Sequence, residues 1–158
     1  MSVNDYYTML VCENGHVLTD CLEHSSNSTP HCSECGAKTI SQCPSCGAII
    51  RGDLRESIVL TTRMTPAPKY CPECGEPFPW TSASLDALRE LAEFDDDLDA
   101  DDVNALVKSA ETALTEGPET KVAAMRIKKT LGKAGKATAV AARDLLVDVI
   151  AESAKRAI

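Results

Sequence analysis

The pattern of hydrophobic and polar positions changes character at about residue 80. Before it, residues 6–11 and 57–62 have the composition of short strands, and Gly, Pro, Ser and Asn interrupt the remainder. After it, apolar residues recur at the three- and four-residue spacing of amphipathic helices. The sequence therefore predicts two domains, a β-rich one over residues 1–80 and a helical one over residues 81–158.

Four apolar stripes predict a bundle of three or four helices in the second domain. Thr81 is a suitable N-cap for the first helix, and Gly117 with Pro118 ends the second and starts the third. We expect the last helix to run from about Thr138 to the end of the sequence. The stripes consist of Leu85, Leu88, Leu91 and Ala92; of Val103, Leu106, Val107, Ala110 and Leu114; of Ala123, Ile127, Leu131 and Ala134; and of Ala142, Leu146, Val149, Ile150 and Ala157.

Large apolar side chains are scarce, which limits the core that the first domain can build. The whole sequence has 2 Phe, 3 Tyr and 1 Trp. The tryptophan, Trp80, stands at the end of the β-rich region, and we expect it to pack that region against the helical one. Small domains without a sufficient apolar core are commonly stabilised by bound metal ions. All 8 cysteines lie between Cys12 and Cys74, which indicates such a solution here.

Three copies of the pattern Cys-x-x-Cys-Gly indicate metal binding. This spacing places two sulfurs about 3.5–4 Å apart on a tight turn, as a zinc knuckle requires. The glycine after the second cysteine tolerates the left-handed backbone of such a turn. The spacing suits chelation better than an ordinary structural disulfide. The six predicted ligands are Cys32, Cys35, Cys43, Cys46, Cys71 and Cys74.

Two tetrahedral zinc sites need eight ligands, so two more must be found. Cys12 and His16 flank an Asn-Gly turn dipeptide that follows a strand-like run. Cys21 and His24 offer the alternative, with a Cys-x-x-His spacing but without a turn glycine. We favour Cys12 and His16, which leaves Cys21 as a spare thiol and His24 as a surface histidine.

Sequential pairing of these ligands is the simplest arrangement, and interleaved pairing is the alternative. Only seven residues separate Cys35 from Cys43, which makes interleaving difficult. The predicted fold is therefore small α+β: a double zinc ribbon of short β-hairpins and knuckles, followed by the C-terminal α-helical bundle. Two structural Zn²⁺ ions per chain are expected. One is held by Cys12, His16, Cys32 and Cys35, and the other by Cys43, Cys46, Cys71 and Cys74.

A set of short motifs, spread over nearly the whole chain, carries a family resemblance. The motifs are Tyr6-Tyr7, residues 11–17, residues 32–40, residues 43–46, residues 71–81, Thr120-Lys121 and residues 147–150. In these motifs the chain resembles a family of small bacterial double-zinc-ribbon proteins that is catalogued as a domain of unknown function. The resemblance supports Cys12 and His16 as ligands, and it implies no activity.

Charge is distributed unevenly along the chain, whose formal net charge is −8. Residues 1–80 carry −4, residues 81–116 carry −9 and residues 117–158 carry +5. The basic residues 117–158 could contact a nucleic-acid backbone, but the neighbouring acidic residues 81–116 compete for the same lysines. We therefore expect a protein partner or self-association through the helical region, with nucleic acid as the alternative partner. Alanine-rich helix faces without Trp or Phe make membrane binding unfavourable.

The same features favour a non-catalytic role. Catalytic zinc keeps an open coordination position, whereas both predicted ligand sets are cysteine-rich and complete. The N-terminus lacks the basic and apolar regions of a signal peptide, and no apolar run reaches the roughly 18–20 residues of a membrane span. We predict a cytoplasmic zinc-binding adaptor or protein-interaction module that is not an enzyme. The alternative is a nucleic-acid-binding zinc-ribbon protein that uses the basic C-terminal region.

Overall fold

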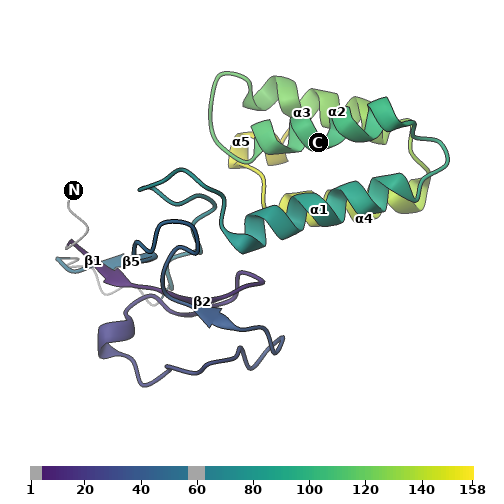
Figure 1. The fold of residues 1–158 in the computed structure, drawn as a ribbon. Helices are drawn as coiled ribbons and strands as arrows, with labels where there is room; N and C mark the ends of the chain where they lie inside the picture. The colour runs from purple at the N-terminus through teal and green to yellow at the C-terminus, as the bar shows by residue number, and fades with distance from the viewer. Residues whose placement is uncertain (1–4, 57–62) are drawn as a thin grey trace. The chain divides into compact units, whose positions relative to one another are not determined.

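The computed structural model describes residues 5–56 and 63–158. The chain divides into two compact units, Met1–Thr81 and Ser82–Ile158, close to the predicted boundary. Short antiparallel strands fill the first unit and helices fill the second (Figure 1), so the small α+β class is confirmed. The second predicted strand, residues 57–62, lies outside the described residues.

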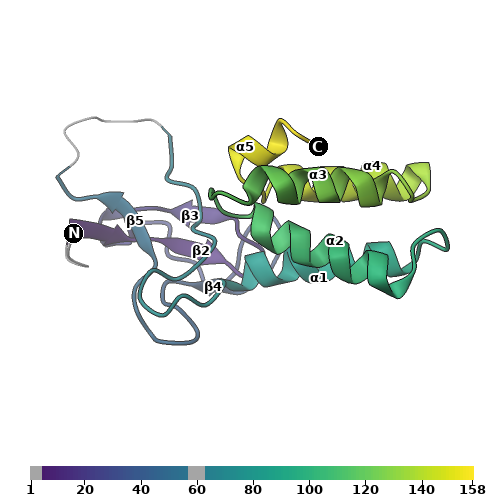
Figure 2. The ribbon, with the colours of Figure 1, turned by 90° about the horizontal axis from the view of Figure 1, so that it is seen from above.

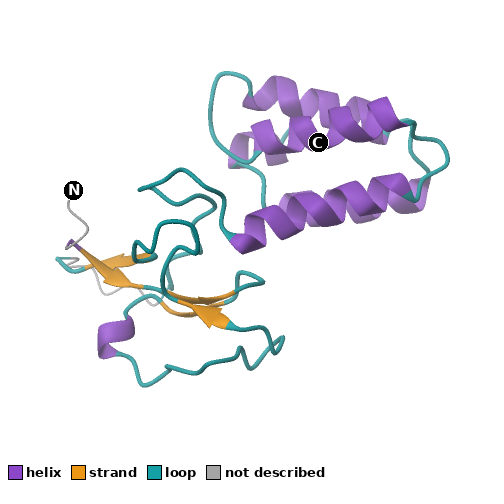
Figure 3. Cartoon of the chain, in the orientation of Figure 1, coloured by secondary structure: helices purple, strands orange, loops and turns teal. Residues whose placement is uncertain are grey.

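Among the described residues of the first unit, the strands form two small antiparallel sheets (Figure 3). In one, β1 (Tyr6–Thr8) pairs with β5 (Arg51–Leu54). In the other, β2 (Leu10–Cys12) lies between β3 (Val17–Thr19) and β4 (Thr39–Ile40). The run predicted as one strand over residues 6–11 is therefore two strands. They separate at Met9, whose N–H donates to the carbonyl oxygen of Ile50 at 2.8 Å.

The core of the first unit is small and includes metal-ligand candidates. Phe78 and Trp80 stack with their ring centroids 4.8 Å apart and their planes 12° apart. The indole N–H of Trp80 donates to the carbonyl oxygen of Pro68 at 2.8 Å, so these contacts of the ring lie within the first unit. Few apolar residues complete this core. Its buried members are Met9, Val11, Cys43, Ile50, Cys71, Phe78 and Trp80.

The second unit contains four helices of twelve or more residues and one short helix, shown from a second side in Figure 2. They are α1 (Pro79–Glu93), α2 (Ala100–Ala113), α3 (Thr120–Leu131), α4 (Lys136–Val147) and α5 (Glu152–Lys155). The predicted apolar stripes face inward. Leu88, Leu106, Ile127, Leu131 and Leu146 are each at most 1% exposed. No helix in the described part of the chain is long and apolar enough to cross a membrane.

The first helix begins earlier than predicted. Pro79 occupies its first position, where a missing N–H costs nothing because the first turn has no intrahelical acceptors. Thr81 is therefore inside the helix and is not its N-cap. Its hydroxyl donates to the carbonyl oxygen of Lys69 at 2.8 Å, a contact within the first unit, to which residues 79–81 belong.

The prediction of one helix from Thr138 to the end is wrong. The helix α4 ends at Val147, and α5 starts after Ala151. The N–H of Ala151 donates to the carbonyl oxygen of Ala113 at 2.8 Å, and Ile150 is 2% exposed. The bend brings the chain to the end of α2 and buries the apolar side chains of Ile150 and Ala151, which stabilises it.

Polar contacts fasten both ends of the helical unit. At one end, Asp95 accepts from the N–H of Gly135 at 2.9 Å, and Asp102 pairs with Lys133 at 2.7 Å. At the other end, Glu116 accepts from the N–H of Ser153 at 3.0 Å and also from its hydroxyl. These contacts hold the two ends of the bundle in fixed positions.

Candidate metal centres

The eight residues predicted as ligands lie together in two groups of four. Metal centre 1 consists of Cys12, His16, Cys32 and Cys35, and metal centre 2 consists of Cys43, Cys46, Cys71 and Cys74. Within each group, one potential ligand atom per residue lies within 4.8 Å of the other three. The structure therefore groups the candidates sequentially along the chain, and it does not interleave them. Each centre is a constellation that can hold a metal ion.

Four similar turns position these residues. Each has a glycine with positive φ, a region that costs other residues about 1–2 kcal/mol. The angles are +89° at Gly15, +74° at Gly36, +76° at Gly47 and +79° at Gly75. Each of these glycines donates its N–H to the carbonyl oxygen of the first cysteine of its turn, at 2.8–2.9 Å. The turn after Cys12 is thus built like the three Cys-x-x-Cys turns, although it is one residue shorter.

The distances in metal centre 1 fit a tetrahedrally bound metal ion. Sγ of Cys12 lies 3.7 Å from Sγ of Cys35. Nδ1 of His16 lies 3.5 Å from Sγ of Cys12 and 3.7 Å from Sγ of Cys32. Metal–ligand bonds of about 2.3 Å to sulfur and 2.0–2.1 Å to nitrogen imply tetrahedral edges of about 3.8 Å and 3.6 Å. The atom of His16 that faces the centre is therefore Nδ1.

Metal centre 2 has the same dimensions with four sulfurs. Sγ of Cys43 lies 3.8 Å from Sγ of Cys74, and Sγ of Cys46 lies 3.7 Å from Sγ of Cys71. A disulfide would require about 2.05 Å. All 8 cysteines are free thiols. The sulfurs are thus spaced as ligands around a common point.

The second ring nitrogen of His16 faces a carboxylate. Nε2 lies 3.8 Å from Oε2 of Glu34, which belongs to the knuckle formed by Cys32 and Cys35. A carboxylate behind a metal-binding histidine favours the tautomer with its proton on the outer nitrogen, and it orients the ring. In the sequence Glu34 stands between Cys32 and Cys35. Its position was visible in the sequence, but its partner was not.

Each centre is half buried, because two of its four ligand candidates are buried and two are exposed. At the exposed Cys35, the N–H of Ala37 lowers the pKa of the thiol most, and polar groups of Asn14, His16 and Cys12 add to the effect. The result is a pKa of about 6. The thiolate is the form that binds metal, so metal centre 1 contains a ligand that is already ionised at neutral pH.

In metal centre 2 the thiols differ in their pKa values. Burial raises the pKa of Cys43, but hydrogen bonds from the N–H groups of Cys46 and Ser45 and from nearby thiols outweigh it, and the pKa is about 7. At Cys74 the N–H of Glu76 lowers the pKa, but burial and the other three thiols raise it to about 12. Negative charge cannot accumulate on four adjacent sulfurs unless a cation lies between them, and a divalent metal supplies it.

The alternative ligands, Cys21 and His24, lie outside both centres. Sγ of Cys21 is 3.8 Å from the hydroxyl of Thr19. The ring of His24 meets the ring of Tyr7 edge to face, with centroids 5.2 Å apart. Cys21 is the N-cap of the 3₁₀ helix η2 (Leu22–His24) and His24 is its last residue, so this segment makes its contacts with other parts of the unit.

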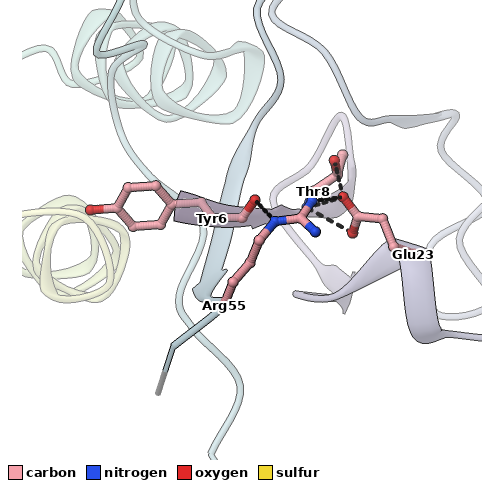
Figure 4. A network of polar contacts seen from close by, with 4 residues as sticks. All are labelled: Tyr6, Thr8, Glu23 and Arg55. Atoms are coloured by element: carbon pink, nitrogen blue, oxygen red, sulfur yellow. Dashed lines mark hydrogen bonds and ion pairs between the residues drawn. The ribbon is translucent and has the colours of Figure 1, made fainter. Parts of the chain in front are cut away.

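A polar network explains why η2 is held away from the centres (Figure 4). The carboxylate of Glu23 accepts from the N–H and the hydroxyl of Thr8 at 3.0 and 2.8 Å, and from the guanidinium of Arg55 at 3.0 Å. Nε of Arg55 also donates to the carbonyl oxygen of Tyr6 at 3.0 Å. The network joins η2, β1 and the residue after β5.

Comparison with known proteins matches the chain to a protein family. A family model described as "Uncharacterized protein conserved in bacteria (DUF2321)" matches residues 5–158. No match was found among curated proteins or among solved structures. The family match spans both structural units.

Proposed function

We propose that this chain, which belongs to the family of uncharacterised proteins conserved in bacteria, is a non-catalytic zinc-binding adaptor. The observation that carries the proposal is the closed form of each metal centre, in which four protein atoms lie within 4.8 Å of one another. A tetrahedral ion with four protein ligands has no open position for water or substrate. The ions then serve to hold the chain in a binding-competent shape.

Zinc is the metal that these donors favour among the common structural ions. Thiolate and imidazole ligands in tetrahedral sets select zinc, and iron is the main competitor at an all-cysteine site. The sulfur separations of 3.7–3.8 Å agree with zinc–sulfur bonds of about 2.3 Å. With two ions per chain, the binding free energy of zinc replaces the apolar core that the first unit lacks.

The exposed apolar side chains of the helical unit support a role in protein contact. Phe94 is 80% exposed and Met125 is 67% exposed. Val122, Val140 and Val147 are also exposed, on α3 and α4. Val122 and Met125 are three residues apart on α3 and so are neighbours on its surface, and neighbouring exposed apolar side chains are more often found where another protein binds than elsewhere on a monomer. On this proposal, the metal-held unit and the helical unit each present a binding surface.

Nucleic acid is the second candidate partner, and the composition of α3 favours it. This helix carries four cationic residues and no acidic one: Lys121, Arg126, Lys128 and Lys129. Two observations favour protein. Exposed Val122 and Met125 interrupt the cationic surface, and the next lysine, Lys133, is already paired with Asp102 at 2.7 Å. The net charge of −8 also opposes approach to a polyanion.

A capture experiment with a nuclease arm tests the proposal. The zinc-loaded chain, immobilised, should retain a defined protein from a bacterial lysate, and nuclease treatment should leave that protein bound. The double variant Lys128→Glu/Lys129→Glu, with unchanged zinc content, should lose a partner that docks on α3. Submicromolar binding to random-sequence DNA or RNA at physiological salt, weakened steeply by added salt, would transfer the function to nucleic acid.

A further inference from the structure

An exposed aromatic side chain stands in an acidic segment at one end of the helical unit. Phe94 follows the last residue of α1, and its ring is among the most exposed apolar groups of the described residues. Glu93, Asp96 and Asp97 surround it in sequence and are exposed. We call these four residues the acidic knob. Asp96 and Asp97 make no ion pair with any described residue, so their charge is available to a partner.

The acidic knob is held in place by its neighbour Asp95. This side chain is buried, and its carboxylate accepts from the N–H of Gly135 and of Asp97, each at 2.9 Å. The N–H of Phe94 continues the helical hydrogen bonding of α1 by donating to Glu90 at 3.3 Å. The knob is therefore fixed on a rigid element, so that binding through it sacrifices little conformational entropy.

A groove of complementary character lies between α3 and α5. It has a volume of about 420 Å³ and is lined by Lys121, Met125, Ser153, Arg156 and Ala157. Its floor is apolar, because the methylene groups of Lys121 and Arg156 line it together with the side chains of Met125 and Ala157. Volumes of about 300–1,000 Å³ are typical of sites that enclose a ligand, and an aromatic side chain is well within that range.

The charge at the groove is positive. Lys121 has no ion pair with a described residue, and Arg156 lies beside it on α5's C-cap. Two carboxylates also lie near the groove: Glu116 accepts from the lining residue Ser153, and Glu152 lies near Arg156 and pairs with Lys155 at 2.8 Å. The three cations, Lys121, Lys155 and Arg156, outnumber these two acids. The groove therefore favours a ligand that places an apolar side chain on its floor and carboxylates beside its cations.

The C-terminal end of α1, which the knob follows, and α5, which lines the groove, lie at opposite ends of the helical unit (Figures 1 and 2). The knob is at the end where Asp95 holds Gly135, and the groove is at the end where Ala151 binds Ala113. The 14 residues of α2 connect these ends and span about 20 Å at 1.5 Å per residue. One copy of the chain cannot place its own knob in its own groove, but it can fill the groove of another copy.

We propose that the helical unit self-associates head to tail, with Phe94 of one copy in the α3–α5 groove of a second copy. Asp96 and Asp97 then face Lys121 and Arg156, and the ring meets Met125, a favourable sulfur–aromatic contact. The inference rests on the proposed adaptor function, because assembly multiplies the number of binding surfaces. Each copy uses two different surfaces, so association produces rings or open chains.

Electrostatics favours this arrangement over a symmetric one. Residues 93–102 contain seven acidic residues and no basic one, whereas α3 contains four basic residues and no acidic one. A two-fold contact between two knobs would bring like charges together, and a contact between two α3 surfaces would do the same. Head-to-tail association brings opposite charges together in a chain whose net charge of −8 otherwise keeps copies apart.

Sedimentation velocity on the full zinc-loaded chain tests the inference. Wild-type protein should associate with increasing concentration, and added salt should weaken the association. Phe94→Ala should raise the dissociation constant about tenfold or more, as expected for a central aromatic anchor. Val140→Ala removes another exposed apolar side chain, on α4 and 49% exposed, and should leave the association unchanged. Circular dichroism and zinc content verify that each variant is folded.

A mixing experiment separates head-to-tail association from any symmetric contact. Phe94→Ala keeps the groove but lacks the aromatic ring of the knob. Lys121→Glu/Arg156→Glu keeps the whole knob but reverses the charge of the groove. Each variant alone should be monomeric, and their mixture should give a one-to-one complex and nothing larger. A mixture that stays monomeric, a wild-type chain that is monomeric at all concentrations, or a Phe94→Ala variant that associates normally would overturn the inference. None of these results changes the zinc content or partner capture that test the proposed function.

Discussion

At the scale of single residues, the carboxylate behind His16 is the feature that the structure adds to the ligand set. Glu34 is exposed, and its Oε2 lies 3.8 Å from the outer nitrogen of the imidazole. We predict that Glu34→Gln lowers the zinc affinity of metal centre 1 by about tenfold, the lower end of the usual range for such partners. A chelator competition that resolves the two ions would measure it.

A matched control for Glu34 exists in the third knuckle. Glu73 occupies the same position between Cys71 and Cys74, but it pairs with Arg51 and not with a histidine. Glu73→Gln should therefore leave the affinity of metal centre 1 unchanged. Equal effects of the two substitutions would show that Glu34 acts only through general surface charge.

Two turn glycines should respond differently to a methyl group. A Cβ at Gly36 meets no atom within 4 Å, so Gly36→Ala should cost only the strain of a positive φ, about 1–2 kcal/mol. A Cβ at Gly15 would lie 3.1 Å from Cβ and Cγ of Trp80. Gly15→Ala should destabilise the fold by about 1–3 kcal/mol more, as overpacking does.

Urea unfolding of the zinc-loaded protein, followed by the fluorescence of Trp80, would compare the two variants. Equal free energies of unfolding would mean that Trp80 moves aside at little cost. In that case the ring would not be packed against the first metal-binding turn as tightly as the structure indicates.

At the scale of elements, the turns could be predicted because they depend on residues close together in the sequence. The ends of helices and strands could not, because they depend on contacts between distant residues. The four turns depend on a cysteine and a glycine a few residues apart, so the sequence identified each of them. The break after Val147 depends on the hydrogen bond from Ala151 to Ala113, and the break at Met9 depends on Ile50. Periodicity within a segment contains no information about such partners.

The ligand residues show the same contrast between local and distant contacts. The six cysteines of the Cys-x-x-Cys pairs could be found from spacing alone, because both sulfurs belong to one turn. Choosing between Cys12 with His16 and Cys21 with His24 required a weaker argument from turn chemistry. The binding of Glu23 to Thr8 and Arg55, which holds the second pair away, joins three separate segments and could not be read from the sequence.

The loop between α1 and α2 should depend on the charge of Asp95. Hydrogen bonds from Thr138, from Asp97 and from Gly135 hold the pKa of this carboxyl below its ordinary value. A depressed pKa in the folded state means that the stabilisation is complete above the unfolded pKa, near 3.9, and is lost as pH falls through the folded value. We predict that Asp95→Asn destabilises the helical unit at neutral pH and that its deficit disappears in acid.

Asp96 provides the control for this prediction, because it is the next residue and is exposed. Asp96→Asn should leave the midpoint of thermal unfolding unchanged at neutral pH. Thermal unfolding of both variants at pH 7 and at low pH, at concentrations where the chain is monomeric, gives the comparison. A pH-independent deficit in Asp95→Asn would assign its effect to packing and not to charge.

At the scale of the whole molecule, the two units should differ in their dependence on metal. The buried core of the helical unit contains no metal-ligand candidate, whereas the core of the first unit contains Cys43 and Cys71. We predict that strong chelation unfolds the first unit and leaves most of the helical signal in far-ultraviolet circular dichroism.

Trp80 makes this prediction measurable unit by unit. It is the only tryptophan of the chain, and it is buried against Phe78 in the first unit. Its fluorescence should change on chelation while the ellipticity at 222 nm persists. Simultaneous loss of both signals would mean that the two units unfold cooperatively. It would contradict the claim that metal stabilises the first unit and the apolar core stabilises the second.

Each chain should hold two zinc ions in closed four-ligand centres, and a metal count on matched variants tests this most directly. Elemental analysis of protein purified without added metal should give two zinc ions per wild-type chain. His16→Ala should reduce the count toward one, because a three-ligand centre holds metal weakly, and His24→Ala and Cys21→Ser should both retain two. One zinc ion per wild-type chain, iron in place of zinc, or loss of metal from Cys21→Ser but not from His16→Ala would contradict the assignment of the two centres.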